Sequence, residues 1–78
     1  MHHANRDLAE KWAKYDEEAR EIRKRHANWS FIESQPPRIR EALKLYIETG
    51  DVRLASKIAG LKLEEFIMLY KKAGIPTI

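Results

Sequence analysis

The feature that most constrains this chain is an uninterrupted run of helix-forming residues near its N-terminus. Residues 5–28 contain no glycine or proline and are rich in Ala, Glu, Lys and Arg, which all favour helices. Apolar or partly apolar residues recur through this run at alternating steps of four and three, at Leu8, Trp12, Tyr15, Ala19, Ile22, His26 and Trp29. Such spacing is that of a heptad repeat, which places these residues on one narrow face of a helix. We therefore predict a long amphipathic helix over residues 5–29 that packs against one partner helix.

The partner helix can belong to a second copy of the chain or to the same chain. In a parallel dimer, the flanking positions pair Lys11 with Asp16 of the second copy and Glu18 with Arg23 of the second copy, and both pairs attract. This complementarity favours a homodimer held by the seven residues of the repeat. The alternative is that the helix folds back onto its own C-terminal half, because Trp and Tyr are bulky for a tight two-stranded interface.

A break separates this helix from the rest of the chain. Residues 30–37 end in Pro36-Pro37, and the residue before a proline avoids helical geometry. Apolar residues in this connection indicate that it packs down. A second helix is expected from Pro36 or Pro37, with Ser34 as its cap and Gly50 as its end. Its core-facing residues would be Ile39, Ala42, Leu43, Tyr46 and Ile47.

Two shorter helices are expected next. Asp51 can cap a helix over 52–59, whose buried face would be Val52, Ala55, Ile58 and Ala59. Gly60 forms a tight turn, and a last helix over about 62–73 carries Leu63, Phe66, Ile67 and Tyr70 on its inner face before Gly74 and Pro76 stop it. The predicted fold is all-α: a long N-terminal heptad helix, then a compact three-helix unit over residues 36–78.

The last two helices have the plan of a helix-turn-helix motif. Small residues are needed where the two helices cross, and Ala55, Ser56 and Ala59 supply them. Gly60 can adopt positive φ in the turn, and Leu61 follows as an apolar plug. A plain helical hairpin shares much of this pattern and remains the alternative.

Residues 41–77 also resemble a known family. The segments that carry the resemblance are Ala42-Leu43-Lys44-Leu45-Tyr46, Ala55-Ser56-Lys57-Ile58-Ala59-Gly60-Leu61, Glu65-Phe66 and Gly74-Ile75-Pro76. They are similar to small prokaryotic, often archaeal, helix-turn-helix proteins described as antitoxins of toxin–antitoxin pairs. The family usually carries Ser or Thr where Lys62 stands here, and its spacing from Tyr46 to Gly60 is slightly longer. The resemblance implies DNA binding and, as in some members of the family, a toxin protein as a second partner.

The charge distribution fits a nucleic-acid partner without requiring one. The net charge is +3, and the whole excess lies in residues 36–78, which carry eight basic against five acidic side chains. The candidate DNA-binding residues are Arg38, Arg40, Arg53, Lys57, Lys62, Glu65, Lys71 and Lys72. Glu64 and Glu65 are unfavourable near phosphates, although Glu can accept from cytosine. We therefore expect weak, phosphate-directed binding by a dimer. The alternative is a protein–protein interaction module that docks a partner on the Glu64, Glu65 and Met68 face.

Other chemistry is not supported by the sequence. The chain has no cysteine, which excludes disulfides and thiolate metal sites and favours a cytoplasmic location. The three histidines have no metal-ligand spacing, and no phosphate-binding loop or nucleophile motif occurs. No apolar run is long enough for a membrane span. We expect neither enzymatic activity nor a cofactor.

Overall fold

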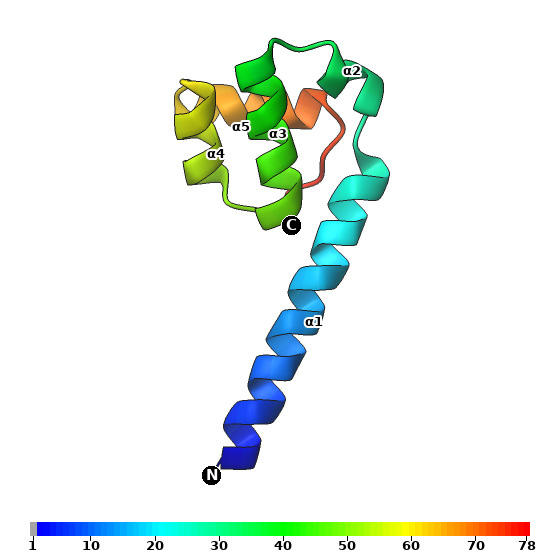
Figure 1. Cartoon of the computed structure of the whole chain (residues 1–78), viewed down its shortest axis with the longest axis vertical. Coiled ribbons are helices and arrows are strands. Elements are labelled where there is room, and N and C mark those ends of the chain that lie inside the picture. The colour runs from blue at the N-terminus through cyan, green and yellow to red at the C-terminus, as the bar shows by residue number, and fades with distance from the viewer. Residues whose placement is uncertain (1) are drawn as a thin grey trace.

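The computed structural model describes residues 2–78, and the side chains of residues 8–78. This part of the chain is all-α and contains no strand. Its five helices are α1 (His2–His26), α2 (Trp29–Glu33), α3 (Pro37–Thr49), α4 (Val52–Ala59) and α5 (Leu63–Lys72). Figure 1 shows α1 projecting from a compact group of the four shorter helices, and the molecule measures 48 × 23 × 18 Å. The predicted long N-terminal helix followed by packed shorter helices is confirmed.

α1 ends at His26, three residues before the predicted end. The N–H of Asn28 donates to the carbonyl of Ala73 at 2.8 Å, and its side-chain oxygen accepts from the N–H of Phe31 at 3.1 Å. Asn28 therefore caps the next helix, and this bonding stops α1.

The expected irregular connection over residues 30–37 contains most of α2 instead. Ile32 on this helix is fully buried, and Phe31 packs against the core, so the prediction that the connection packs down is confirmed. The predicted Ser34 cap is wrong. Its hydroxyl donates to the carbonyl of Phe31 at 2.6 Å, and Pro36 stands at the N-cap of α3 without a side-chain hydrogen bond.

The later helices begin and end within a residue of their predicted limits. The Asp51 carboxylate accepts from the N–H of Leu54 at 3.0 Å and so caps α4. Gly50 and Gly60 end α3 and α4 with φ of +70° and +71°, in the left-handed region that glycine enters at least cost.

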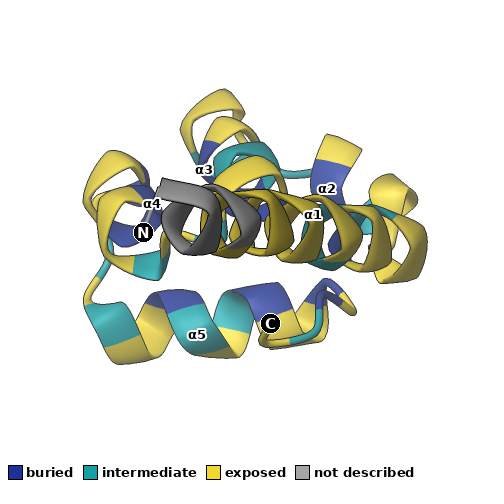
Figure 2. Cartoon of the chain, turned by 90° about the horizontal axis from the view of Figure 1, so that it is seen from below, coloured by how far each residue is buried: buried dark blue, intermediate teal, exposed yellow. Residues whose placement is uncertain are grey.

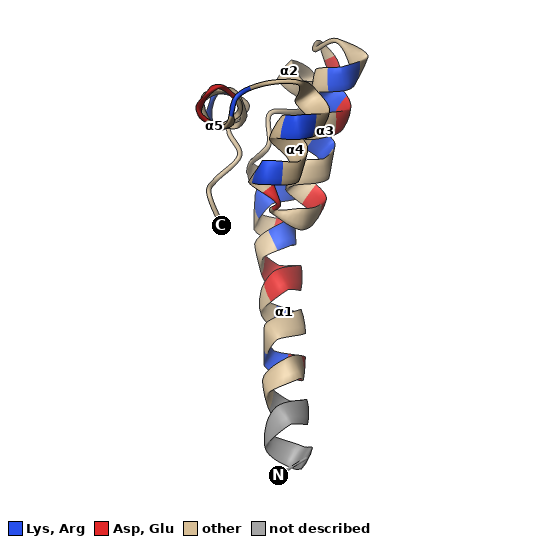
Figure 3. Ribbon diagram, turned by 90° about the vertical axis from the view of Figure 1, so that its left-hand side faces the viewer, with Lys and Arg blue, Asp and Glu red and all other residues tan. Residues whose placement is uncertain are grey.

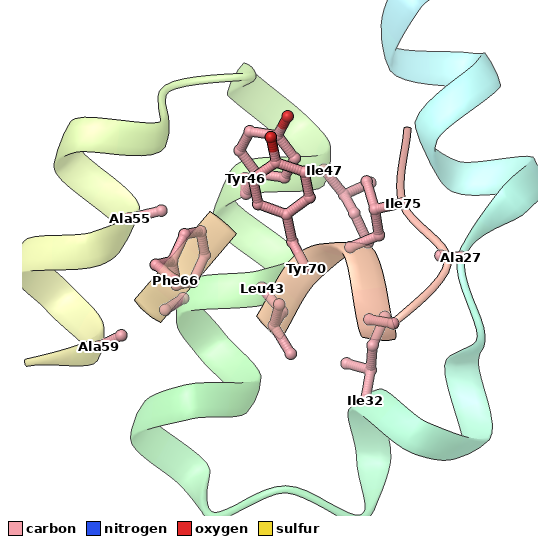
Figure 4. Close-up of a cluster of buried hydrophobic side chains, with 12 residues drawn as sticks. Ala27, Ile32, Leu43, Tyr46, Ile47, Ala55, Ala59, Phe66, Tyr70 and Ile75 are labelled. Carbon is pink, nitrogen blue, oxygen red and sulfur yellow. The ribbon is translucent and has the colours of Figure 1, made fainter. Parts of the chain in front are cut away.

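The core lies among α3, α4 and α5 and is closed by α2 and the segment after α5 (Figure 4). Tyr46, Phe66 and Tyr70 form its aromatic centre. The rings of Tyr46 and Tyr70 stack at 4.3 Å between centroids, and the ring of Phe66 meets Tyr46 edge-on at 6.1 Å. Ring pairs with these geometries stabilise the core beyond the contribution from burying the rings.

This aromatic centre changes the pKa of one of its tyrosines, Tyr46. Burial raises the pKa of the Tyr46 hydroxyl well above its ordinary value, and the neighbouring Tyr70 hydroxyl raises it further. Tyr70 in turn shares a 2.8 Å hydrogen bond with the Thr77 hydroxyl, which holds the segment after α5 against the core.

The buried face of α4 differs in part from the prediction. Ala55 and Ala59 are buried, together with Ser56, whereas Val52 is only half-buried. Ile58, expected inside, is 39% exposed. Small side chains therefore form the contact, and α4 lies close to the core without inserting a large residue. Figure 2 shows the contrast between this packed group and the exposed length of α1.

Arg23 joins α1 to the compact group. Its side chain is only 4% exposed, and its Nε donates to the carbonyl of Ile47 at 2.8 Å while Nη1 donates to the oxygen of Ile78 at 2.5 Å. The Ile47 carbonyl is one of the last in α3, which have no partner within the helix, and a cation is favoured there by the helix dipole. The predicted pairing of Arg23 with Glu18 of a second copy is therefore wrong.

Candidate nucleic-acid interface

The turn between α4 and α5 is closed by two backbone hydrogen bonds around Gly60. Its N–H donates to the carbonyl of Lys57 at 3.1 Å, and the N–H of Leu61 donates to the carbonyl of Ser56 at 3.0 Å. This pair of bonds is typical of helices that end at a left-handed glycine. Leu61 packs against the core as predicted. Lys57 and Lys62 flank the turn, and both are exposed.

Arg38 reaches the same turn from α3. Its Nε donates to the carbonyl of Ile58 at 2.7 Å, near the end of α4, and its guanidinium covers Gly60: a Cβ at Gly60 would lie 3.1 Å from Arg38 Cζ. Arg38 nonetheless remains exposed. Arg38, Lys57 and Lys62 thus surround one turn, and we call these three residues the turn cluster.

The cations of the turn cluster take part in no ion pair with any side chain that the structure describes. The ion pairs of residues 8–78 are Lys24–Glu48 at 3.2 Å, Arg40–Glu41 at 3.8 Å and Lys44–Glu33 at 3.1 Å. Arg53 is likewise exposed and unpaired, and it precedes Lys57 on α4 by one turn. Figure 3 shows Lys and Arg positions following one another along α3 and α4. Of the predicted contacts, Arg40 is the one already held by a carboxylate.

The N-terminus of α5 is acidic, and one of its carboxylates has a structural use. The N–H of Lys62 donates to Glu65 Oε1 at 2.9 Å, which is one half of a capping box. Glu65, predicted to lie near DNA, therefore helps to begin α5. Glu64 is exposed, and so is Met68, whose 73% exposure is the highest among the large apolar side chains described.

The last two predicted contacts lie at the other end of α5. Lys71 and Lys72 are exposed in its last turn, where they complement the helix dipole. Lys72 Nζ lies 5.9 Å from the centre of the Phe31 ring. Lys71 lies nine positions after Lys62, or about 14 Å along a helix, so Lys71 and Lys72 are not part of the turn cluster.

The free length of α1 exposes apolar side chains. Five of the seven residues of the predicted interface lie along it, and we call them the α1 stripe: Leu8 (54% exposed), Trp12 (61%), Tyr15 (69%), Ala19 (half-buried) and Ile22 (36%). Most of this stripe has no cover within the chain.

The other two predicted interface residues lie elsewhere. His26 is the exposed last residue of α1. Trp29 begins α2, and its indole N–H donates to the carbonyl of Lys24 at 3.1 Å. The stripe therefore ends at Ile22. Asn28 is the sequence signal that could have located this end, because asparagine is a preferred helix cap.

Among residues 8–78, no three His, Asp or Glu side chains come together as a metal site. None of the described helices combines the length and the apolar character needed to cross a membrane. The chain matches no protein-family model, no curated protein and no solved structure.

Proposed function

We propose that the chain is a DNA-binding transcriptional regulator of helix-turn-helix type. In this proposal α4 and α5 are the two helices of the motif, and α3 is the helix that supports them. The observation that carries it is the turn cluster, in which three exposed cations surround the α4–α5 turn without a carboxylate partner among the described side chains. Cations placed in this way are suited to phosphate oxygens.

Binding would be directed mainly at the DNA backbone. Recognition helices place their first residues on base edges, and α5 offers Glu64 and Glu65 there, of which Glu65 is already used to cap the helix. Arg38 is oriented by its bond to α4, so its planar guanidinium is positioned before DNA arrives. Backbone contacts of this kind are sequence-independent and strongly dependent on salt.

The resemblance of residues 41–77 to antitoxins extends the proposal to a toxin protein as a second partner. In that family a Ser or Thr follows the turn, and here Lys62 together with Glu65 takes over the capping position. The departure therefore preserves the start of the second motif helix and adds a cation beside the turn.

The test is the salt dependence of DNA binding. Neutralising two phosphate contacts in a Lys57→Gln, Lys62→Gln variant should lower the slope of log affinity against log salt by about 1.8, since each contact contributes about 0.9. Affinity should fall equally on unrelated duplexes. Lys14→Gln, which removes one exposed cation from α1, is the control and should leave the slope unchanged. Absence of any gel shift at about 50 mM salt with tens of micromolar protein would refute the proposal, since non-specific binding should be visible there.

Glu65→Gln provides an opposite test. The amide oxygen of glutamine can still accept from the N–H of Lys62, so the start of α5 is preserved while a negative charge is removed. Binding should tighten or stay equal, with the slope unchanged. Weaker binding would mean that Glu65 itself contacts a base.

A protein–protein interaction module is the second candidate. The observation that favours it is the outer face of α5, where Glu64 lies beside the highly exposed Met68. A protein ligand that is lost in Met68→Asp and retained in Lys57→Gln, Lys62→Gln would support this candidate over DNA binding.

A further inference from the structure

The structure points to a second copy of this chain as the occupant of the α1 stripe, and we propose that two α1 helices pair in antiparallel orientation. This proposal does not depend on DNA binding. Leu8, Trp12 and Tyr15 are each more than half exposed, and they share one face of a helix whose remaining surface is largely charged. Contiguous apolar patches of this kind are typical of interaction sites.

The charges that flank the stripe match in the antiparallel orientation. If Trp12 lies opposite Tyr15 of the second copy, Leu8 lies opposite Ala19 of the second copy. Antiparallel helices bring the same side of each stripe together, and Lys11 and Glu18 lie on the same side. Lys11 faces Glu18 of the second copy, and the symmetry of the pair repeats this contact. Both side chains are exposed, and neither belongs to an ion pair within the described side chains.

The parallel orientation loses half of its predicted charge pairs. It needs Arg23 as the partner of Glu18, but Arg23 is buried and bonded to the carbonyl of Ile47. Only the pair of Lys11 with Asp16 would remain. A parallel arrangement also places Trp12 against Trp12 and Ala19 against Ala19, which puts the largest and the smallest side chains in separate layers.

The surroundings of Ala19 favour a large residue opposite it. A shallow hollow of about 160 Å³ beside Ala19 is lined by Tyr15, Glu18, Ile22 and Ile78. The antiparallel register brings Leu8 of the second copy to this place, so a large apolar side chain meets a small residue with space next to it. Close packing of this kind is what helix pairs require.

The antiparallel pair also separates the two compact groups. In this register Arg23 of one copy lies level with residue 4 of the second copy. Arg23 of the second copy lies 19 positions from that residue, so the two Arg23 residues are about 28 Å apart along the axis. Each compact group then sits at its own end of the pair. In a parallel pair both groups would lie at the same end.

Disulfide trapping tests the orientation directly, because the chain has no cysteine of its own. Leu8→Cys and Ala19→Cys are prepared separately and then oxidised alone and as a mixture. The antiparallel pair predicts a mixed dimer, identified by its mass, and little dimer from either variant alone. Dimers from each variant alone would show a parallel pair, and no dimer in any sample would mean that α1 has another occupant; either result overturns the proposal.

Charge reversal gives a second test that keeps the stripe intact. Lys11→Glu or Glu18→Lys alone should raise the dissociation constant measured by sedimentation roughly tenfold, because each reverses two symmetric contacts. The double variant should recover nearly all of the loss, since the pairs are restored with their signs exchanged. Lys14→Glu, which lies away from the stripe on the same helix, is the control and should have little effect. Failure of the double variant to recover, or a wild type that stays monomeric throughout the micromolar range, overturns the proposal.

Discussion

Replacing Arg23 with alanine should destabilise the fold more than the same change at any other charged side chain that the structure describes on α1. Arg23 donates to the buried carbonyl of Ile47 and to the part-buried oxygen of Ile78. A hydrogen bond from a charged group contributes about 1.5–3 kcal/mol to stability, and the full range applies only to the buried one. We expect Arg23→Ala to lower the free energy of unfolding by about 2–4 kcal/mol. That is a large fraction of the roughly 4–12 kcal/mol expected for a chain of this size.

Urea unfolding followed by circular dichroism measures this loss. With a slope near 1 kcal/mol per molar urea, the midpoint should fall by about 2 M or more. All variants must be compared at one low protein concentration, because self-association would add to the apparent stability. Arg23→Met is informative as a second variant. It keeps much of the packing volume but leaves the Ile47 carbonyl unpaired, so it should lose about 1–3 kcal/mol.

Arg25→Ala is the matched control. Arg25 lies two residues further along α1 and is exposed, so its replacement should change stability by less than about 0.5 kcal/mol. If Arg23→Ala unfolds at the midpoint of this control, the two hydrogen bonds do not join α1 to the compact group. Arg23 would then be available to Glu18 of a second copy, as a parallel pair requires.

Two further predictions concern the compact group. Gly60→Val should lower the free energy of unfolding by about 1–3 kcal/mol through backbone strain at φ +71° and lower the melting temperature by several degrees. Gly60→Asn should cost less, because asparagine tolerates this conformation better. Equal melting curves for wild type and Gly60→Val would contradict the assignment of the turn. The raised pKa of Tyr46 predicts that the urea midpoint is constant below about pH 10 and falls above it. Above that pH the tyrosine ionises in the unfolded chain before it ionises in the folded one, which favours the unfolded state. Tyr46→Phe should remove most of this alkaline loss, and an identical decline in both proteins would assign it to other groups.

The sequence predicted those parts of the fold that depend on chemistry within a few residues. Asp51 caps the helix that follows it by accepting from an N–H three residues away. Gly50 and Gly60 end helices by their own backbone freedom. The limits of α3, α4 and α5 were therefore readable. α2 was not, because a helix of five residues has too little periodicity to separate it from an irregular segment.

The parts that sequence analysis missed depend on placement in space. Arg23 has the spacing of an exposed flanking residue, and nothing near it in the sequence indicates that the end of α3 lies against it. Ile58 fits a helical periodicity, but α4 contacts the core through its alanines and leaves this side chain outside. Glu65 was readable in principle, since an acidic residue three positions after a cap is a known helix start, but a lysine at the cap hides the pattern.

The candidate site was predictable in composition but not in arrangement. The excess of basic residues over residues 36–78 points to the half of the chain that holds the turn cluster. It does not show that Arg38, twenty residues before Ile58, bonds to that residue's carbonyl, nor that Arg40 is held by Glu41. Both contacts are visible only in the folded arrangement.

Arg23 and Arg38 use the same physical arrangement with opposite exposure. Arg23 lies on α1 and donates through Nε to a carbonyl near the end of α3, and Arg38 lies on α3 and donates through Nε to a carbonyl near the end of α4. Each guanidinium covers the left-handed glycine that follows the contacted helix, Gly50 or Gly60, whose missing Cβ leaves room for it. Arg23 is buried, so its hydrogen-bonding capacity is spent within the fold and its effect is stability. Arg38 is exposed, so its bond to α4 orients it while its charge still faces solvent. If the proposed function is right, Arg38→Gln should therefore weaken DNA binding with little loss of stability. Arg23→Gln should instead lower stability and have little direct effect on DNA binding.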